Sequence, residues 1–490
     1  MLEFNDKFNL KPLIAALTAS LLSMSTWAAE GVVKPSGFGL LSADGQSSIN
    51  IYGQFHFDAR SIRDGLGESA DKDAASGADN FEIRRGRLGI AGTIAKDIEY
   101  EFITNTLGSS SNLIHRAYVN YGYKKSSQFR VGRFKQPFSL EEMSSANGID
   151  FMERSYGDQL VPGHRLGLMM HGEPIKGFTY GVSAYQNGFN EVTNTNNVGK
   201  SSAARLTLNL AEIQNISNMI LHVGLGSDQG RYTILPTVTS DTGAVASSTT
   251  RATVLSFRTE NRGLANAYRA QLSGDQITPT FGGVANNAAN VTNDLKGLEV
   301  ALANGGFKFQ AEYIKAAYSA NATIRDYTPA TSVALGTAAL DVSADTHYYE
   351  FIYNLTGEPW ASAYKSGVFG TIKPQSNFGM GSGGGWGAWQ LAFRISDYKA
   401  SIPITSGTRS NLETFGAGVG SAEDNTTRVD NSQGARTTTY GVNWILNPNA
   451  RLMFNYARTE FDRPVQYLST TGLGTTNKED VLSLRWQMAL

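Results

Sequence analysis

The stretch Asp480-Val-Leu-Ser-Leu-Arg-Trp-Gln-Met-Ala-Leu490 alternates without interruption between apolar and more polar side chains. Because successive side chains of a β-strand point to opposite faces, this stretch predicts a strand with one apolar face and one mixed face. The apolar face consists of Leu482, Leu484, Trp486, Met488 and Leu490. A tilted strand needs about 9–11 residues to cross the hydrocarbon core of a bilayer. A soluble antiparallel edge strand would show the same alternation, so the rest of the chain must decide between the two.

The amino-terminal segment has the three parts of a secretory signal. Lys7 and Lys11 precede an apolar run over residues 13–24, and Thr26-Trp-Ala28 fits the small-x-small cleavage rule. The alternative is a membrane anchor, but the apolar run is too short for a spanning helix, which needs about 20 residues. We therefore expect residues 1–28 to be a signal peptide, cleaved after Ala28 or one residue later.

The composition of residues 29–490 favours one barrel domain. No long apolar stretch follows the signal, so insertion into a membrane would have to use strands, since only helices and closed barrels satisfy their backbone in lipid. About 460 residues are long for one soluble core but suit a barrel. The chain has 52 glycines, 13 prolines and no cysteine, so it has no disulfides, and its net charge of −1 does not suggest a nucleic-acid partner.

Alternating segments recur along the chain from Ile49 onward: sixteen starts are given below and residues 81–94 add one more, so the count is close to sixteen. This pattern predicts an all-β fold, a transmembrane antiparallel β-barrel of an even number of strands, about sixteen. The segments begin near Ile49, Ile98, Leu113, Phe129, Arg165, Phe178, Ala204, Met219, Thr253, Leu298, Phe307, His347, Trp389, Tyr440, Leu452 and Val481.

The connections between these segments differ in length. Long polar stretches cover residues 61–80, 187–202, 228–250, 261–294, 317–344 and 401–436. Short connections occur at residues 95–97, 304–306 and 447–449. Long loops at one end and tight turns at the other are typical of an outer-membrane barrel.

Basic residues recur out of phase with the apolar face. They are Arg116, Arg130, Arg165, Arg205, Arg258, Lys308, Arg394, Arg451 and Arg485. An Arg or Lys on the lipid face costs about 2–4 kcal/mol at mid-membrane, so in a barrel these side chains must face the lumen. In a soluble protein the same pattern would be a solvated basic face.

The segment Phe81-Glu-Ile-Arg-Arg-Gly-Arg-Leu-Gly-Ile90 adds three more arginines. Its apolar phase changes between Ile83 and Leu88, which predicts a bulge or kink near Gly86. With that change Arg84, Arg85 and Arg87 can all face inward.

Fewer acidic residues share the inward phase. They are Asp58, Glu82, Glu99, Glu101, Glu299, Glu312 and Glu350. A guanidinium group matches phosphate or carboxylate oxygens and stays charged, and rings of Arg or Lys select anions in pores. The excess of arginine therefore favours an anion channel. The glutamates could instead neutralise it locally and leave a weakly selective channel.

Residues 136–163 form a long excursion after a predicted strand. Ser139 with Glu142 three residues later is a capping box, so we expect a short helix to begin there. Such a loop can fold into the lumen as a constriction or lie on the surface, and the pattern does not separate the two.

Several blocks of sequence resemble the phosphate- and polyphosphate-selective porins of the porin O and P family. They are Arg-Arg-Gly-Arg-Leu-Gly (84–89), Ala-Tyr-Val-Asn-Tyr (117–121), Val-Gly-Arg-Phe-Lys-Gln-Pro-Phe-Ser-Leu-Glu-Glu (131–142), Asp-Phe-Met-Glu-Arg-Ser (150–155), Leu-Thr-Gly-Glu (355–358), Gly-Trp-Gly-Ala-Trp (385–389) and Gly-Val-Asn-Trp-Ile-Leu-Asn-Pro-Asn (441–449). The resemblance implies a sixteen-stranded barrel, usually trimeric, with the third extracellular loop folded inward, an arginine ladder and a central anion site.

By that resemblance Arg84, Arg85 and Arg87 look like ladder members, and Arg133 and Lys135 stand where the constriction loop leaves its strand. Residues 228–294 and 317–344 match the family poorly, and Leu490 stands where barrels usually end in an aromatic residue. Such a resemblance is stronger evidence that this chain shares the fold of the family than that it shares the preference for phosphate.

The expected function is a passive outer-membrane pore for small anions, phosphate or polyphosphate first. The expected anion-binding residues are Arg84, Arg85, Arg87, Arg116, Arg130, Arg133, Lys135, Arg165, Arg205 and Arg394. The alternatives are a weakly selective diffusion porin and an outer-membrane hydrolase. None of the six histidines lies in a catalytic motif, and no metal-ligand spacing or cofactor motif occurs. The expected partners are small anions, outer-membrane lipid and two further copies of the chain.

Overall fold

The computed structural model describes residues 32–33, 38–63, 80–107, 113–187, 199–234, 237–240, 248–263, 267–272, 289–328, 331–381, 384–402, 412–415, 431–469 and 472–490. The predicted signal peptide at residues 1–28 lies outside the described residues. No helix of the described residues is long and apolar enough to cross a membrane.

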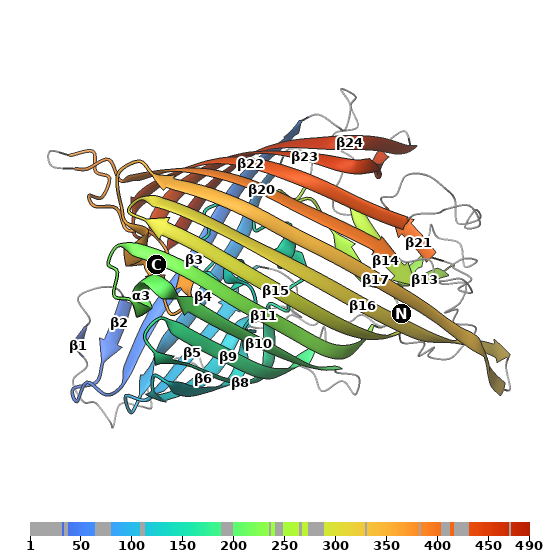
Figure 1. Cartoon of the computed structure of the whole chain (residues 1–490), viewed down its shortest axis with the longest axis horizontal. Helices are drawn as coiled ribbons and strands as arrows, with labels where there is room; N and C mark the ends of the chain where they lie inside the picture. The colour runs from blue at the N-terminus through green and yellow to red at the C-terminus, as the bar shows by residue number, and fades with distance from the viewer. Residues whose placement is uncertain are drawn as a thin grey trace, which may run out of the picture.

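Sixteen antiparallel strands form one closed barrel (Figure 1), which confirms the predicted fold. The barrel strands are β3 (Ser48–Arg63), β4 (Asn80–Ile94), β5 (Ile98–Asn105), β6 (Ile114–Lys124), β7 (Ser127–Lys135), β8 (His164–Ile175), β9 (Phe178–Asn187), β10 (Gly199–Asn209), β11 (Met219–Ile234), β15 (Ala289–Asn304), β16 (Phe307–Thr328), β17 (Thr331–Asn354), β20 (Ala388–Ile402), β22 (Asn431–Asn447), β23 (Ala450–Ser469) and β24 (Gly472–Ala489). The barrel closes where β24 pairs with β3, from Asp480 opposite Arg63 to Ala489 opposite Gln54. The alternating residues 480–489 are the part of β24 that pairs with β3 and closes the barrel.

The alternation along the strands separates a lipid-facing surface from a polar interior. On β24, Leu484 and Trp486 are 49% and 53% exposed, whereas Arg485 between them is 0% exposed. Other strands also expose apolar side chains on the outer face, for example Leu206, Leu298 and Phe454. In a lipid bilayer these side chains meet hydrocarbon, so their exposure is the expected state of a membrane barrel.

The segment beginning near Thr253 was predicted as a barrel strand, and that prediction is wrong. It forms β13 (Ser248–Phe257), which pairs with β12 (Thr237–Ser240) and β14 (Tyr268–Leu272), and β14 pairs with β21 (Leu412–Phe415). This small sheet lies in the connections after β11 and β20. Phe257 and Tyr268 are fully buried in it. Alternation with a period of two arises equally from packing against protein and against lipid.

Two further predictions about the connections are wrong. Within residues 317–344, predicted as a polar loop, residues 317–328 belong to β16 and residues 331–344 to β17, and the two strands pair up to Thr328 and Thr331. Their many small residues suit strands that continue beyond the hydrocarbon, where neither face needs an apolar side chain. The connection between β17 and β20 is long, although the sequence predicts only tight turns at that end. It contains η6 (Trp360–Ala363), β18 (Tyr364–Lys365) and β19 (Val368–Phe369).

A charge placed on the outer face should destabilise the barrel. We expect Leu484→Arg to lower the free energy of unfolding by about 2–4 kcal/mol, because the guanidinium would enter hydrocarbon. Urea titration of the protein folded into lipid vesicles measures this change. Leu355→Arg is the matched control, since Leu355 lies in the connection after β17 and is 53% exposed. An equal loss in both variants would contradict the assignment of the outer face.

Candidate functional site

Residues 136–163, which connect β7 to β8, lie inside the barrel and reach its far wall. The Met152 amide donates a 2.8 Å hydrogen bond to Asn455 Oδ1 on β23. Asn443 Nδ2 on β22 donates to the Asp150 carbonyl at 2.8 Å, and Lys308 Nζ on β16 lies 2.5 Å from Asp150 Oδ2. We call this segment the inner loop.

The inner loop begins with the predicted short helix, α2 (Leu140–Met143). Ser139 is its N-cap, and the Ser139 hydroxyl accepts a 3.2 Å hydrogen bond from the Glu142 amide, which confirms that half of the capping box. Glu312 on β16 accepts from the Leu140 amide at 3.0 Å, so the helix start is also held by the barrel wall.

Ion pairs fix the inner loop at both ends. The Glu153 carboxylate accepts hydrogen bonds from three guanidinium groups on the adjacent strands β4, β3 and β24. The donors are Arg84 at 2.7 Å, Arg60 at 2.9 Å and Arg485 at 3.2 Å. Burial by itself would raise the pKa of the Glu153 carboxyl, but the surrounding arginine charges outweigh it and hold the pKa well below its usual range.

The other end of the inner loop is held by Arg394 on β20, which is 1% exposed. Its guanidinium contacts Glu141 at 3.2 Å, Glu260 at 2.9 Å and Glu350 at 3.4 Å. Glu260 follows β13, so this second connection also enters the barrel. Here burial outweighs the Arg394 charge and raises the pKa of the Glu260 carboxyl.

The side of the barrel formed by β15–β22 is largely occupied by inward-folded connections. From the loop end, the residues after β13 pack around Tyr156. From the turn end, Trp360 and Phe369 of the β17–β20 connection form one apolar cluster with Leu140 and Phe151 of the inner loop. Open space is therefore found on the opposite side, against strands β3–β8.

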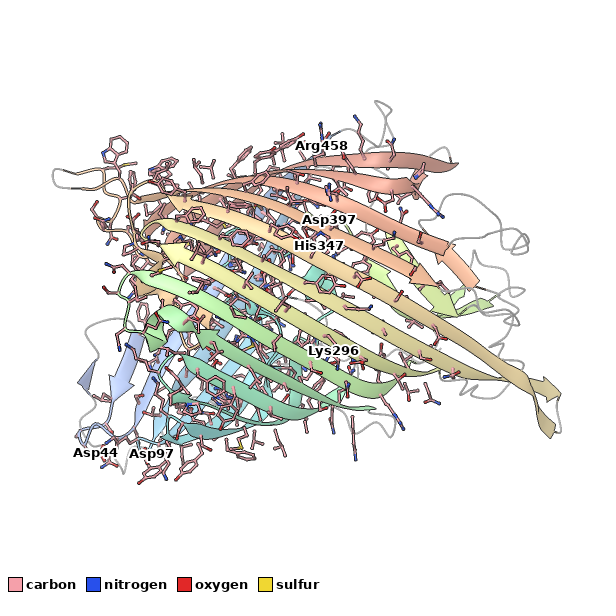
Figure 2. All side chains as sticks on the ribbon, in the orientation of Figure 1. Asp44, Asp97, Lys296, His347, Asp397 and Arg458 are labelled. Atoms are coloured by element: carbon pink, nitrogen blue, oxygen red, sulfur yellow. The ribbon has the colours of Figure 1, made fainter. Side chains whose placement is uncertain are left out.

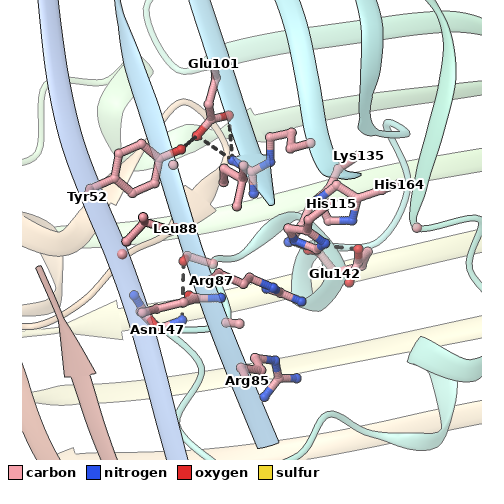
Figure 3. A pocket seen from close by; sticks show the side chains of 18 of the residues that line it. Tyr52, Arg85, Arg87, Leu88, Glu101, His115, Lys135, Glu142, Asn147 and His164 are labelled. Carbon is pink, nitrogen blue, oxygen red and sulfur yellow. Dashed lines mark hydrogen bonds and ion pairs between the residues drawn. The ribbon is translucent and has the colours of Figure 1, made fainter. Parts of the chain in front are cut away.

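A cavity of about 440 Å³ lies between the inner loop and this opposite wall (Figure 3). Its polar lining consists of Tyr52, Gln54, Arg85, Arg87, Glu101, His115, Arg116, Lys135, Glu142, Ser145, Asn147, Arg154, Asp158 and His164. A second cavity of about 340 Å³ is lined by Arg84, Arg85, Arg87, Asn105, His115 and Arg133, among others. Arg85, Arg87 and His115 line both cavities, so the two spaces meet at these residues.

Two β-bulges add basic side chains to this region. On β4, Ile83 pairs with Phe57 and Arg85 pairs with His56, which leaves Arg84 as the extra residue. The predicted bulge therefore exists, two residues before Gly86. It lets Arg84 reach Glu153 while its neighbour Arg85 lines the cavities.

The second bulge is on β6, where Ile114 and Arg116 pair with successive residues of β5 and leave His115 unpaired. The sequence analysis missed His115 as a site residue. The sequence feature that could have indicated this bulge is the three-residue spacing of the apolar residues Ile114 and Ala117, because it breaks the strand period of two. The His115 ring lies 4.2 Å, centroid to centroid, from the ring of His164.

Arg85 and Arg87 differ from the other arginines of the larger cavity in their partners. Arg85 Nη1 lies 3.3 Å from His56 Nδ1, and Arg87 Nε donates to Asn105 Oδ1 at 3.1 Å. Within the part of the chain that the structure describes, neither forms an ion pair. By contrast Arg116 pairs with Glu101 at 2.8 Å. The cavity therefore holds two cationic groups that no carboxylate of the described residues contacts.

The inner loop contributes its own charged cluster to the cavity. Arg154 Nη1 lies 3.0 Å from Glu142 Oε2, and Lys135 Nζ donates to the Ser144 carbonyl at 2.7 Å. Burial raises the pKa of the Asp158 carboxyl well above its usual range, and the nearby Glu142 adds to this rise against the opposing Arg154 charge. The pKa of Glu142 remains low despite burial, because Arg154 and Lys135 lie beside it. The sequence analysis missed Arg154 and Asp158.

The remaining predicted site residues lie elsewhere. Arg205 pairs with Glu299 at 2.7 Å and donates to the Gly367 carbonyl at 2.8 Å. Like Arg394, it lines neither cavity and instead holds an inward-folded segment. The Arg130 guanidinium stacks 4.3 Å from the Tyr118 ring centroid. Arg165, near the start of β8, also lines neither cavity.

Arg258, predicted on a barrel strand, instead follows β13, where its amide donates to Gln159 Oε1 at 2.9 Å. No group of three or more His, Cys, Asp or Glu that could hold a metal ion occurs among the described residues.

A closed sixteen-stranded antiparallel barrel with an apolar outer face and a polar interior narrowed by an inner loop defines a porin of the bacterial outer membrane. A family model described as "Phosphate-selective porin O and P" matches residues 49–489. The chain belongs to this family. It is therefore a channel and not an enzyme.

The chain is also similar to individual proteins. Porin O of Pseudomonas aeruginosa is 24% identical over 397 residues, covering 79% of this chain and 78% of that protein. Among solved structures, the loop L8 deletion mutant of OmpT of Vibrio cholerae matches with a TM-score of 0.49 and 10% identity, covering 91% of this chain and 100% of that chain. An anion-selective porin from Comamonas acidovorans matches with a TM-score of 0.44 and 11% identity, with the same coverage of each chain.

Proposed function

We propose that this porin conducts small anions and binds phosphate transiently while phosphate crosses the channel. Polyphosphate is a second candidate substrate. The observation that carries the proposal is the pair Arg85 and Arg87, which line both cavities without a carboxylate partner in the described structure. Guanidinium groups replace part of the hydration of a phosphate through charge-assisted hydrogen bonds. Arg84, paired with Glu153, and Arg133 extend the basic lining of the smaller cavity.

A weakly selective diffusion porin is the second candidate, favoured by the carboxylates of the same cavity. Glu101 and Glu142 line it together with the basic groups, and Asp158 joins them once the pH rises above its raised pKa. Phosphate added to a chloride solution separates the two functions in a planar bilayer. A phosphate-binding pore will show saturable block of the chloride current, because an occupied site delays passage. A current that changes only in proportion to bulk conductivity would favour the second function.

The chain is expected to be exported to the outer membrane by a signal peptide, residues 1–28, which is then cleaved, and to assemble as a homotrimer. Support for assembly comes from the shortness of strand β5, which has eight residues and makes the barrel wall less tall at this position. At about 3.3 Å per residue and a tilt near 45°, β5 rises only about 19 Å, less than the apolar band of about 25 Å. Neighbouring protomers packed against this side would remove the mismatch. Cross-linking and amino-terminal sequencing of the purified protein test the two expectations.

The selectivity should depend on pH through Asp158. Because its pKa is raised, the Asp158 carboxyl keeps its proton above the usual carboxyl range and adds no negative charge to the cavity there. When the pH rises through the raised pKa, a carboxylate forms and anion selectivity should fall. Reversal potentials recorded over a pH series measure this. Asp158→Asn should remove the step, and an unchanged pH profile in that variant would contradict the assignment.

A further inference from the structure

The outer face of the barrel changes from apolar to charged at one level. Figure 2 shows Lys296, His347, Asp397 and Arg458 on the outer side of β15, β17, β20 and β23 at a similar distance along the barrel. On β17, for example, Tyr349 and Phe351 are exposed just below this level, on the side of the turns. Tyrosines followed by charges mark the edge of the hydrocarbon in membrane barrels.

This charged level belongs to the outer leaflet. The charges lie toward the end of the strands that carries the long loops, and long loops of outer-membrane barrels face the outside of the cell. Asp44 and Asp97 lie at the opposite, turn-bearing end (Figure 2).

One row within this level is dominated by lysine. Lys296 pairs in register with Lys315, Lys315 with Asp345, and Asp345 with Lys399, across β15, β16, β17 and β20. All three lysines are exposed. We call these three side chains and Asp345 the lysine row. Like charges directly opposite each other destabilise a sheet, so the pairing in register of Lys296 with Lys315 does not by itself stabilise the barrel.

The hydrogen bonds and ion pairs of the lysine row neutralise only part of its positive charge. Lys296 Nζ lies 2.9 Å from Asp294 Oδ1 and donates to Ser227 Oγ at 3.0 Å, and Asp345 accepts from the Tyr313 hydroxyl at 2.7 Å. Among the described residues, Lys315 and Lys399 form no ion pair. Three ammonium groups against two carboxylates, those of Asp294 and Asp345, still present an excess of positive charge to the lipid headgroups.

We propose that the lysine row binds the phosphorylated sugar headgroup of a lipopolysaccharide in the outer leaflet. The row covers three strand spacings, about 14 Å, which is long enough for a disaccharide with a phosphate at each end. The exposed apolar side chains below it, among them Leu298 at 46%, would contact the acyl chains of the same molecule. Charge complementarity above and hydrocarbon contact below thus favour one amphipathic phosphorylated lipid.

Native mass spectrometry of the full-length protein in detergent, titrated with diphosphoryl lipid A, tests this proposal. We expect the triple variant Lys296→Gln, Lys315→Gln, Lys399→Gln to bind this lipid at least fivefold more weakly than the unmodified protein. The unmodified protein should also bind dephosphorylated lipid A more weakly than the diphosphoryl form. The single variant Lys315→Gln, with a smaller expected loss, replaces the triple variant if the triple variant does not fold.

The matched control removes three exposed lysines at the turn end, by Lys124→Gln, Lys176→Gln and Lys365→Gln. This control should bind diphosphoryl lipid A as the unmodified protein does. The proposal is overturned if the lysine-row variants bind the lipid normally, or if both control and test variants lose affinity equally. It is also overturned if lipid A binds equally with and without its phosphates, which would show hydrocarbon contact alone, or if inorganic phosphate at equal concentration displaces it.

Discussion

Replacing Arg85 and Arg87 together with alanine will remove most of the anion selectivity and the phosphate block of this channel. These two guanidinium groups line both cavities, and no described carboxylate contacts either one. A hydrogen bond to a charged group contributes about 1.5–3 kcal/mol, or roughly tenfold to a hundredfold in affinity. We therefore expect the phosphate concentration for half-block to rise at least about tenfold in the double variant, measured in a planar bilayer.

The matched control for this variant is Arg436→Ala with Arg458→Ala. Both arginines are exposed on the outer face, and their loss changes the charge of the protein by the same amount. The control should retain the anion selectivity and the phosphate block of the unmodified channel. If both double variants change alike, long-range charge and not the cavity lining sets the selectivity. If neither changes, the arginine pair does not form the anion site.

Replacing Glu153 with glutamine will loosen the inner loop and increase the conductance. Glu153 is the shared partner of Arg60, Arg84 and Arg485, so its neutralisation leaves three cations, of which Arg60 and Arg485 are buried, with less compensation. Removing one partner from a buried ion pair costs about 3–5 kcal/mol. The hydrogen-bonded ladder of the barrel does not depend on this carboxylate, so we expect an intact barrel. Single-channel recording should show larger and noisier current steps.

Glu82→Gln is the control for this effect. Glu82 also contacts Arg60, but it lies on β4 and not on the inner loop. The two variants lose the same charge from the same network, yet only Glu153→Gln releases the loop. A conductance equal to that of the unmodified channel in Glu153→Gln would show that Glu153 does not position the loop.

The barrel and its closing strand could be predicted because lipid imposes one simple rule on each strand. Leu484 and Arg485 must point to opposite sides, and the alternation records this directly. The bulge on β4 could be predicted for the same reason, since a change of phase in a strand requires an extra residue. The segment at Thr253 could not be assigned correctly, because an apolar face that packs against protein has the same period.

The roles of individual arginines could not be predicted, because they depend on partners far away in the sequence. Arg394 faces inward as its phase predicts, but Glu141, Glu260 and Glu350 converge on it only in the folded chain. Arg85 has the same phase yet meets His56 and open space. A periodic pattern therefore gives the side on which a charge lies but not whether another charge neutralises it.

The reversal potential of the unmodified channel in a potassium chloride gradient tests the central claim most directly. A lumen in which unpaired guanidinium groups outweigh the carboxylates should give a reversal potential displaced toward the chloride equilibrium potential. A displacement toward the potassium equilibrium potential would contradict the claim, because the cavity carboxylates would then control passage.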